Sequence, residues 1–392
     1  MKQIAALGLR EYGVYNKSLA DNWNSFVSAE DSEQSLVKLV VALNNNDTKK
    51  VLVQLLKKEP GKVLQGMQIT SYLIGAKESE LYIPAQELEL KAALEKQWEG
   101  MGIAIIAEDF VDCRLQEENV IHHLETMFFL AEAFSKEYQP SVYLAIEKGG
   151  QLSELQKVPY GTKLSDILQV SRDEIRAIEI GTKLYDVAAL DYTVKDTMTF
   201  GNGVITILDK SACIIDEAEK RLALSRSISC GKCTFCREGL LQIHSMVKDI
   251  TKGKGKNEFI PLIEEIGDAT SFSTLCSIGR TGADFVLSSI STYYDEYDDH
   301  LKKKKCQSGV CSSFVPIYID PELCTGCEDC LDVCPENCIE GKAGYIHMID
   351  ELDCTKCGKC FEVCENEAIK KASGKIPKLP DRLTKCGKFK KH

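Results

Sequence analysis

Two runs of cysteine in the last fifth of the chain carry the clearest chemical signal in the sequence. The first reads CTGCEDCLDVCP from Cys324 and the second CTKCGKCFEVC from Cys354, so both have the spacing C-x2-C-x2-C-x3-C. Three thiolates on one tight loop can hold three corners of a cubane iron–sulfur cluster, and the fourth cysteine of each run then serves the other cluster. The expected ligands are Cys324, Cys327, Cys330 and Cys364 for cluster one, and Cys354, Cys357, Cys360 and Cys334 for cluster two.

A pair of zinc sites is the alternative interpretation of these runs, because C-x2-C pairs also build zinc ribbons. Zinc needs four ligands per site and has no use for three in a row with a fourth from the other run, which favours the clusters. Short apolar segments at 317–319 and 345–347 are predicted to form edge strands beside the clusters. Cys338 is expected to be a buried structural thiol and not a ligand.

A third set of cysteines lies in the preceding segment. SISCGKCTFCREGL supplies Cys230, Cys233 and Cys236, and Cys276 follows forty residues later in STLCSIGRTG. Together they fit one [4Fe–4S] cluster with four ligands. Apolar residues recur at helical spacing within 240–250, 259–266 and 285–290, which predicts a small helical bundle around this cluster.

Composition limits the classes of protein to which these motifs can belong. The chain has 392 residues, which allows roughly two to four domains, and its 44% hydrophobic and 27% charged residues are typical of a folded globular protein. Its 18 cysteines occur without an export signal, which favours metal binding over disulfides. Cys113 and Cys386 are expected to be single thiols outside any site.

Charge and hydropathy exclude two further classes. A net charge of −11 argues against general nucleic-acid binding, and no stretch approaches the ~20 apolar residues that a membrane helix needs. We therefore expect a cytoplasmic protein with no membrane or nucleic-acid partner. The lysine-rich tail after Ile369 is interpreted as a solvated end, with a docking arm as the alternative.

The segment SCGKCTFCREG, followed by a lone cysteine before a helix, resembles the C-terminal iron–sulfur domain of the NADH-binding flavoprotein subunit of respiratory complex I. The beta subunits of trimeric electron-bifurcating [FeFe]-hydrogenases share this module. They are more similar to this chain, because they also append a two-cluster ferredoxin domain. Upstream, GTKLSDILQV and IRAIEIG are similar to the ubiquitin-like β-grasp domain that precedes the bundle in this family.

The N-terminal half departs from this family at the flavin site. Flavin-binding members carry a loop that typically reads GLRGRGGAGFPTGLKW around the FMN phosphate, where glycine lets the backbone approach the ligand. In this chain Gly8 to Trp23 reads GLREYGVYNKSLADNW, with side-chain-bearing residues such as Glu11, Val14 and Asn16 where the family has glycine. The following LVVALNNNDTKK lacks the family's acidic pair, and a long family segment is missing before HHLETMFFL. The resemblance therefore implies a retained scaffold that binds neither FMN nor NADH.

Two alternatives apply to this N-terminal half. One is a remodelled pocket for a different nucleotide. The other is a metal or acid–base site at His122 and His123, although neighbouring histidines on a helix would point to different faces.

Four further candidate metal ligands lie outside the clusters. Cys306 and Cys311 lie in KKKKCQSGVC, where the bundle gives way to the ferredoxin domain, and His300 ends the preceding helix. Cys213, in SACIID, is a candidate for the fourth ligand of a closed tetrahedral site. The similar hydrogenase beta subunits have a zinc held by three cysteines and one histidine at this junction, so the resemblance implies one zinc here. Isolated reduced thiols are the alternative.

The sequence thus predicts a multidomain chain that combines α/β and α+β folds, with parts in an order implied by the resemblance. They are a degenerate FMN/NADH-binding-like domain at 1–139, a β-grasp domain resembling soluble-ligand-binding domains at 140–198, a helical [4Fe–4S] bundle at 199–300, a linker with the zinc site at 301–315, a 2[4Fe–4S] bacterial-type ferredoxin domain at 316–374 and a basic tail at 375–392.

The expected function is one-electron relay within a larger oxidoreductase complex. The sequence offers no convincing nucleophile or oxyanion site, so no catalytic residues are expected. Two-electron NAD(P)H chemistry must pass through a flavin before one-electron carriers can act, which implies a flavin-containing NAD(P)H-reacting partner subunit. The resemblance adds a thioredoxin-like [2Fe–2S] subunit, a hydrogenase-type large subunit and soluble ferredoxin as partners, with electron bifurcation as one activity of such complexes. An FMN-containing NADH diaphorase subunit is the alternative function.

Overall fold

The computed structural model describes residues 2–27, 38–113, 119–351, 353–372 and 376–389. The chain divides into two compact units, which are described separately. The first unit consists of Met1–Ala212, Ala218–His244 and Ile260–Thr292, and the second of Cys213–Glu217, Ser245–Phe259 and Tyr293–His392.

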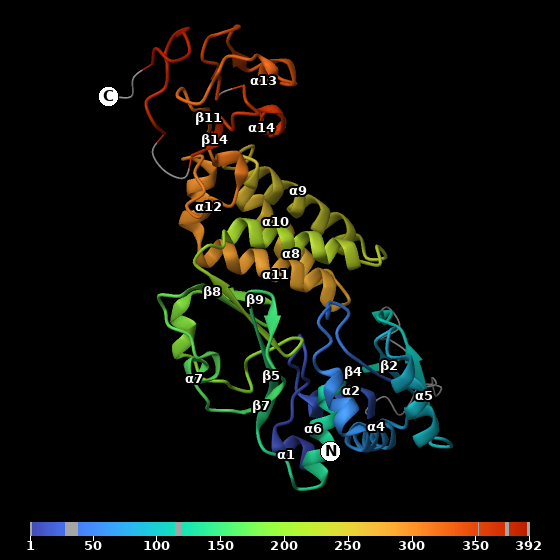
Figure 1. The fold of residues 1–392 in the computed structure, drawn as a ribbon. Helices are drawn as coiled ribbons and strands as arrows, with labels where there is room; N and C mark the ends of the chain where they lie inside the picture. Colours follow the sequence, from blue (N-terminus) through green and yellow to red (C-terminus); the bar gives the residue numbers. More distant parts are fainter. Residues whose placement is uncertain (1, 28–37, 114–118, 352, 373–375, 390–392) are drawn as a thin grey trace. The chain divides into compact units, whose positions relative to one another are not determined.

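The first unit contains a four-stranded parallel sheet in the order β3-β2-β1-β4, of which Figure 1 labels β2 and β4. The central strand β1 reads KLVVA and is buried along most of its length. This is typical of parallel strands that are covered on both faces. The strands are β1 (Lys38–Ala42), β2 (Glu78–Ile83), β3 (Ile103–Ala107) and β4 (Asn119–His123).

Helices α4 and α6 pack closely against each other beside this sheet. Pro60 is the first residue of α4, where its missing N–H costs nothing, and Gly75, which caps the end of the helix after Ile74, has a left-handed φ of 67°. Helix α6 reads LETMFFLAEAF and is buried over most of its length. The helices of this part are α1 (Lys2–Leu7), α2 (Leu19–Val27), α3 (Val53–Lys58), α4 (Pro60–Ile74), α5 (Leu88–Gln97) and α6 (Leu124–Phe134).

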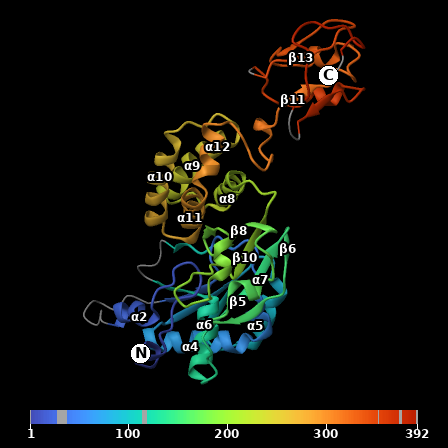
Figure 2. The same ribbon diagram turned by 90° about the vertical axis from the view of Figure 1, so that its left-hand side faces the viewer.

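A second, mixed sheet of six strands follows, in which β10 lies between β5 and β8 (Figure 2). Strand β10 pairs parallel to β5 and antiparallel to β8. The sheet therefore extends to Asp209, beyond residue 198, where the β-grasp domain was predicted to end. Its elements are β5 (Ser141–Lys148), β6 (Gln151–Leu152), β7 (Gln156–Pro159), α7 (Leu164–Leu168), β8 (Ile175–Ile180), β9 (Lys183–Tyr185), a 3-10 helix (Val187–Asp191) and β10 (Val204–Asp209).

A group of helices comes next, and the three apolar patterns at 240–250, 259–266 and 285–290 all fall within them, which confirms the predicted helices. Helices α8 and α9 each have residues in both compact units. Gly267 permits a close approach of α10 and α11, because a Cβ there would lie 2.8 Å from Leu287. The helices are α8 (Ile214–Ile228), a π-helical turn (Phe235–Gly239), α9 (Leu240–Thr251), α10 (Phe259–Ser273), α11 (Ser277–Thr292) and α12 (Tyr294–Leu301).

The C-terminal part of the second unit is a tandem repeat with an offset of thirty residues. The amide of Cys324 donates to the carbonyl of Asp320, and that of Cys354 to the carbonyl of Asp350, both at 3.0 Å. Each repeat contributes one helix and two short strands, and the first strand pairs with the last (Figure 1). The elements are a 3-10 helix (Ser312–Phe314), β11 (Ile317–Ile319), α13 (Asp329–Asp332), β12 (Ile339–Glu340), β13 (Met348–Ile349), α14 (Lys359–Val363) and β14 (Ile369–Lys371).

Two sequence expectations in this region differ from the structure. The strand expected at 345–347 lies instead at β13, which pairs with β12, and Ile346 donates its amide to the carbonyl of Thr384 in the tail at 2.9 Å. The described part of the basic tail is thus not simply a solvated end. Its residue Cys386 also donates its amide to the carbonyl of Gly344 at 3.1 Å. None of the described helices combines the length and the apolar sequence that a membrane span requires.

Candidate metal centres

The bundle cysteines come together at the start of helix α11 and at the π-helical turn. Cys236 lies on that turn and is 5% exposed, and Cys276, at 8%, directly precedes α11. Burial raises the pKa of both thiols, and Cys230 and Cys233 lie close enough to raise it further. A buried thiolate is therefore unfavourable here without a compensating positive charge, which an iron–sulfur cluster supplies.

Three residues beside this set were not recognised as neighbours from the sequence. The Asn45 side chain hydrogen-bonds to Cys276, and the same amide lies 3.7 Å from Sγ of Cys113. Tyr15 donates its hydroxyl to the carbonyl of Leu275 at 3.2 Å. These residues lie in separate loops far from Cys276 along the chain, so no local spacing could have revealed them.

A second centre gathers the four candidate zinc ligands within the second unit. Their ligand atoms all lie within 4.8 Å of one another, and all four side chains are buried. Sγ of Cys213 lies 3.5 Å from Nε2 of His300 and 3.6 Å from Sγ of Cys311. A tetrahedral zinc with Zn–S bonds of ~2.3 Å separates its sulfurs by about 3.8 Å, so the set fits this metal. The residues are Cys213, His300, Cys306 and Cys311.

Surrounding groups orient this centre. Nδ1 of His300 donates to the carbonyl of Glu296 at 2.8 Å, which leaves Nε2 free to face the sulfurs. The ring of His300 also meets Phe314 edge to face at 5.0 Å. Contacts with Cys213 and Cys311 lower the pKa of the Cys306 thiol. The arrangement resembles a closed structural zinc site, in which thiolates and one neutral imidazole fill every position.

The C-terminal cysteines are drawn together across the two repeats. The pKa of Cys330 is raised to about 12, first by burial and then by neighbouring cysteines that include Cys324, Cys327 and Cys364. Cys364 thus lies beside the first run although it belongs to the second.

The second run shows the reciprocal arrangement. Burial and the neighbouring Cys354, Cys357 and Cys334 raise the pKa of Cys360. The structure therefore brings each fourth cysteine to the opposite set, which is the geometry that two cubane clusters need. The exact ligand sets remain predictions.

Side chains of the N-terminal loop occupy the space beside it. Glu11 is 9% exposed and accepts from His122 Nδ1 and from the amide of His123, both at 2.6 Å. Tyr12 stacks on Phe129 with ring centroids 4.7 Å apart. The two cavities that Glu11 and Tyr12 line measure about 30 and 80 Å³.

The two histidines lie at the end of strand β4, so the expectation that they occupy a helix is wrong. Nε2 of His122 accepts from the indole of Trp23 at 2.7 Å, which gives both of its nitrogens a partner inside the fold. Both nitrogens of His123 are buried without a hydrogen-bond partner, and burial lowers the pKa of His123 to about 4. Among the residues described, neither histidine joins a group of metal-ligand type.

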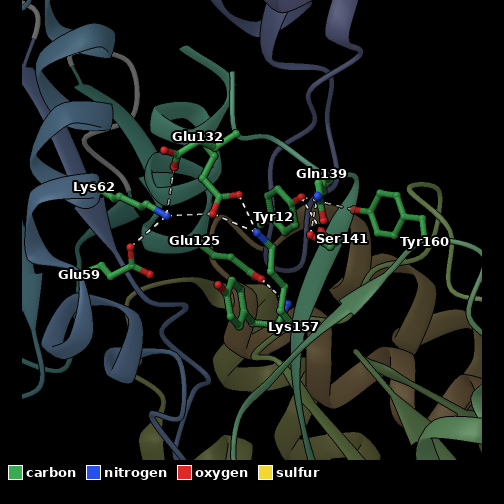
Figure 3. Close-up of polar contacts among 11 residues, drawn as sticks. Tyr12, Glu59, Lys62, Glu125, Glu132, Gln139, Ser141, Lys157 and Tyr160 are labelled. Atoms are coloured by element: carbon green, nitrogen blue, oxygen red, sulfur yellow. Dashed lines mark hydrogen bonds and ion pairs between the residues drawn. The ribbon is translucent and has the colours of Figure 1, made fainter. Parts of the chain in front are cut away.

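A polar network stabilises the scaffold next to this loop (Figure 3). Glu132 accepts from Lys62 at 3.1 Å and from Lys157 at 2.8 Å, and Tyr12 donates its hydroxyl to the carbonyl of Ser141 at 2.8 Å. Glu125 accepts from the amide of Tyr143 at 2.9 Å, and its complete burial raises its pKa to about 8. These contacts tie α6 to its neighbours and are structural.

Comparison with known proteins finds two iron–sulfur families in this chain. The NADH-ubiquinone oxidoreductase-F iron–sulfur binding region matches residues 216–300, and a 4Fe-4S dicluster domain matches residues 316–365. Over its iron–sulfur part, the chain is similar in sequence to subunits of NADP-reducing hydrogenase and of NADH-quinone oxidoreductase. The NADP-reducing hydrogenase subunit HndC of Solidesulfovibrio fructosivorans is 35% identical over 147 residues, and the F subunit of the NADH-quinone oxidoreductase of Streptomyces coelicolor is 27% identical over 106 residues.

These matches cover only part of each protein. The aligned segments span 38% and 27% of this chain, and 30% and 24% of the two relatives. The structure of an NAD+-reducing [NiFe]-hydrogenase in the air-oxidized state matches 77% of this chain and 62% of its own, with a TM-score of 0.64 and 16% identity. This likeness shows that the mixed α/β scaffold is shared over most of the chain.

Proposed function

We propose that the chain is an iron–sulfur electron-transfer subunit. It relays single electrons between a flavin-containing NAD(P)H-reacting partner, ferredoxin and a terminal enzyme such as an [FeFe]-hydrogenase. The observation that supports this proposal is the proximity of the predicted ligands: the four bundle cysteines lie near one another, Cys364 lies near Cys330, and Cys334 lies near Cys360. Bound [4Fe–4S] clusters supply one-electron oxidation and reduction.

The protein's own residues have two tasks in this function. The cysteines hold the clusters as thiolates, and the solvent exposure of each cluster and the hydrogen bonds to its sulfurs set its potential. The proposed ligands are Cys230, Cys233, Cys236 and Cys276 in the bundle, Cys324, Cys327, Cys330 and Cys364 for cluster one, and Cys354, Cys357, Cys360 and Cys334 for cluster two.

The second proposed cofactor is one zinc, bound by Cys213, His300, Cys306 and Cys311. The separation of 3.6 Å between Cys213 and Cys311 supports it, as does the Nδ1 bond that directs Nε2 of His300 toward the sulfurs. The zinc has a structural role, because four protein ligands leave no open position for substrate.

Absence of FMN is also part of the proposal. Pockets for small molecules usually measure ~300–1,000 Å³, whereas the two cavities that Glu11 and Tyr12 line measure about 30 and 80 Å³. Glu11 is held there by the buried His122, and Tyr12 by Phe129, so vacating the space would break hydrogen bonds and aromatic packing. The hydride chemistry is therefore assigned to a partner subunit.

The names of the relatives support a multi-subunit setting. HndC is one subunit of an NADP-reducing hydrogenase, and the Streptomyces relative is one subunit of an NADH-quinone oxidoreductase. The proposed partners are a flavin-containing NAD(P)H-reacting subunit, a thioredoxin-like [2Fe–2S] subunit, a hydrogenase-type large subunit and soluble ferredoxin, in a complex that bifurcates electrons. The proposed location is the cytoplasm, where cysteines stay reduced.

The test is the iron, zinc and flavin content of protein prepared without oxygen. About twelve irons per chain, from three four-iron clusters, one zinc and no flavin are expected. Stoichiometric FMN would overturn the flavin-free relay and favour an FMN-containing diaphorase subunit. A content of about eight irons or fewer would contradict the presence of three clusters.

A further inference from the structure

Three cysteines remain after the proposed cluster and zinc ligands are assigned, and each lies beside a different set of cluster ligands. They are Cys113, Cys338 and Cys386. Cys113 has Cys276 and Cys233 among its charged neighbours. Cys386 lies within hydrogen-bond reach of Cys324. The third, Cys338, can be compared directly with its equivalent residue in the second C-terminal repeat.

Cys338 occupies the position in the first repeat that Ala368 occupies in the second. Asp350 donates its amide to the carbonyl of Cys338 at 2.8 Å, and Asp320 donates its amide to the carbonyl of Ala368 at 2.7 Å. Both residues are buried, with exposed fractions of 5% and 2%, and each directly precedes a strand. The two halves therefore present the same backbone at this point and differ in one side chain.

The backbone donors to the fourth cysteines are also equivalent. The amide of Ala368 donates to Sγ of Cys364 at 3.3 Å, and the amide of Cys338 donates to Cys334. In addition, Sγ of Cys338 lies 3.5 Å from Sγ of Cys334, a contact that an alanine cannot make. It also lies within hydrogen-bond reach of Cys354. Cys334 and Cys354 are both proposed ligands of cluster two.

The direction of this hydrogen bond follows from the chemistry of the ligands. A cysteine bound to iron is a thiolate without a proton, so it can only accept. Cys338 is not needed as a ligand, because the set for cluster two is complete without it. Its thiol therefore keeps its proton and faces the sulfurs of two ligands.

We propose that the Cys338 thiol donates a hydrogen bond to the ligand sulfurs of cluster two and thereby raises the reduction potential of that cluster. A donor to sulfur stabilises the reduced form more, because reduction adds negative charge to the cluster. The inference rests on the proposed function only in requiring that cluster two is bound. Cys338 is a positioning residue in this sense: it acts on the cluster through its ligands.

The experiment is a potentiometric titration of the full chain followed by EPR, with wild type, C338A and C338S compared. C338A should keep all its iron and shift the midpoint of one cluster to a more negative value, while the other clusters stay unchanged. C338S keeps a hydrogen-bond donor of similar size, so the midpoint of this cluster should stay close to the wild-type value. Unchanged midpoints in C338A would overturn the proposal, and so would loss of about four irons, since Cys338 would then be a ligand.

A matched variant in the other repeat tests the proposal by adding the equivalent thiol. A368C places a thiol near Cys364 and should raise the midpoint of cluster one, and it serves as the test if C338A does not fold. A midpoint in A368C that stays at the wild-type value would then count against the proposal. The iron content of the wild type separates failure of the proposed function from failure of this inference. Absence of cluster two would contradict the proposed function. A full set of clusters with potentials that do not depend on Cys338 would contradict only this inference.

Discussion

Nε2 of His300 lies 3.5 Å from Sγ of Cys213, although 87 positions separate the two residues along the chain. Cys306 and Cys311 complete the group, and the four ligand atoms lie within 4.8 Å of one another. Buried thiols with no metal would gain little from this clustering, whereas a zinc would bind all four at once. A zinc bound by this group would therefore tie the segment before helix α8 to helix α12 and to the loop after it.

Substituting Cys213 by serine should remove this zinc and leave the iron in place. The zinc content should fall by about one atom per chain, and the melting temperature of the second unit should fall by more than about 5 °C, because binding of a structural zinc contributes directly to folding. Metal analysis and calorimetry measure the two effects. Ser308→Ala is the control, because Ser308 Oγ lies 3.4 Å from Sγ of Cys306 but is not a ligand. Zinc that persists in C213S would rule out this ligand set.

The bundle cluster is tested by Cys233→Ser. The iron content should fall from about twelve to about eight per chain, and electron flow from a flavin partner to the C-terminal clusters should stop while their EPR signals remain. Cys113→Ser is the matched control, since Cys113 lies beside the set but is not a proposed ligand. Normal electron flow in C233S would take the bundle cluster out of the path.

The sequence predicted the parts of the molecule that depend on local spacing. The three C-x2-C-x2-C runs need only a tight loop, and the helices at 240–250, 259–266 and 285–290 follow from apolar residues one turn apart. The offset of thirty residues between the C-terminal repeats is also visible in the cysteine spacing.

What sequence reasoning missed depends on contacts between distant segments. The carbonyl of the tail residue Thr384 accepts a hydrogen bond from the amide of Ile346, inside the segment expected to be a strand, and no local pattern marks this pairing. His122 and His123 precede a helical pattern closely enough to be assigned to it, yet His122 is paired with Val41 of β1 at the end of a parallel strand. Parallel pairing joins residues far apart in the chain and leaves no signal in one short segment.

The pH dependence of stability is tested by Glu125→Gln. Burial raises the pKa of Glu125 from 4.5 to about 8, so between these values the folded protein holds a proton that the unfolded chain releases. The stability that this group contributes is present at low pH and is lost as the pH rises through about 8. Glutamine is neutral throughout and keeps an oxygen for the amide of Tyr143. E125Q should therefore gain stability over wild type as the pH rises, by on the order of a few kcal/mol at pH 8.5.

Melting temperatures of both proteins at pH 5.5, 7 and 8.5 measure this difference. Glu99→Gln is the control, because Glu99 is exposed and its substitution should give curves parallel to wild type. A difference between E125Q and wild type that does not change with pH would show that Glu125 does not titrate in this range.

Helix α4 offers a pair of glycines that separates packing from helix propensity. A Cβ at Gly66 would lie 2.0 Å from the backbone oxygen of Met127 in α6, whereas one at Gly61 would meet nothing within 4 Å. Alanine favours a helix over glycine by up to ~1 kcal/mol, so Gly61→Ala should be neutral or slightly stabilising. Gly66→Ala must push α6 away from α4 and should cost about 1–3 kcal/mol or more. Thermal unfolding of both variants measures the contrast, and equal melting temperatures would mean that α4 and α6 do not approach each other this closely.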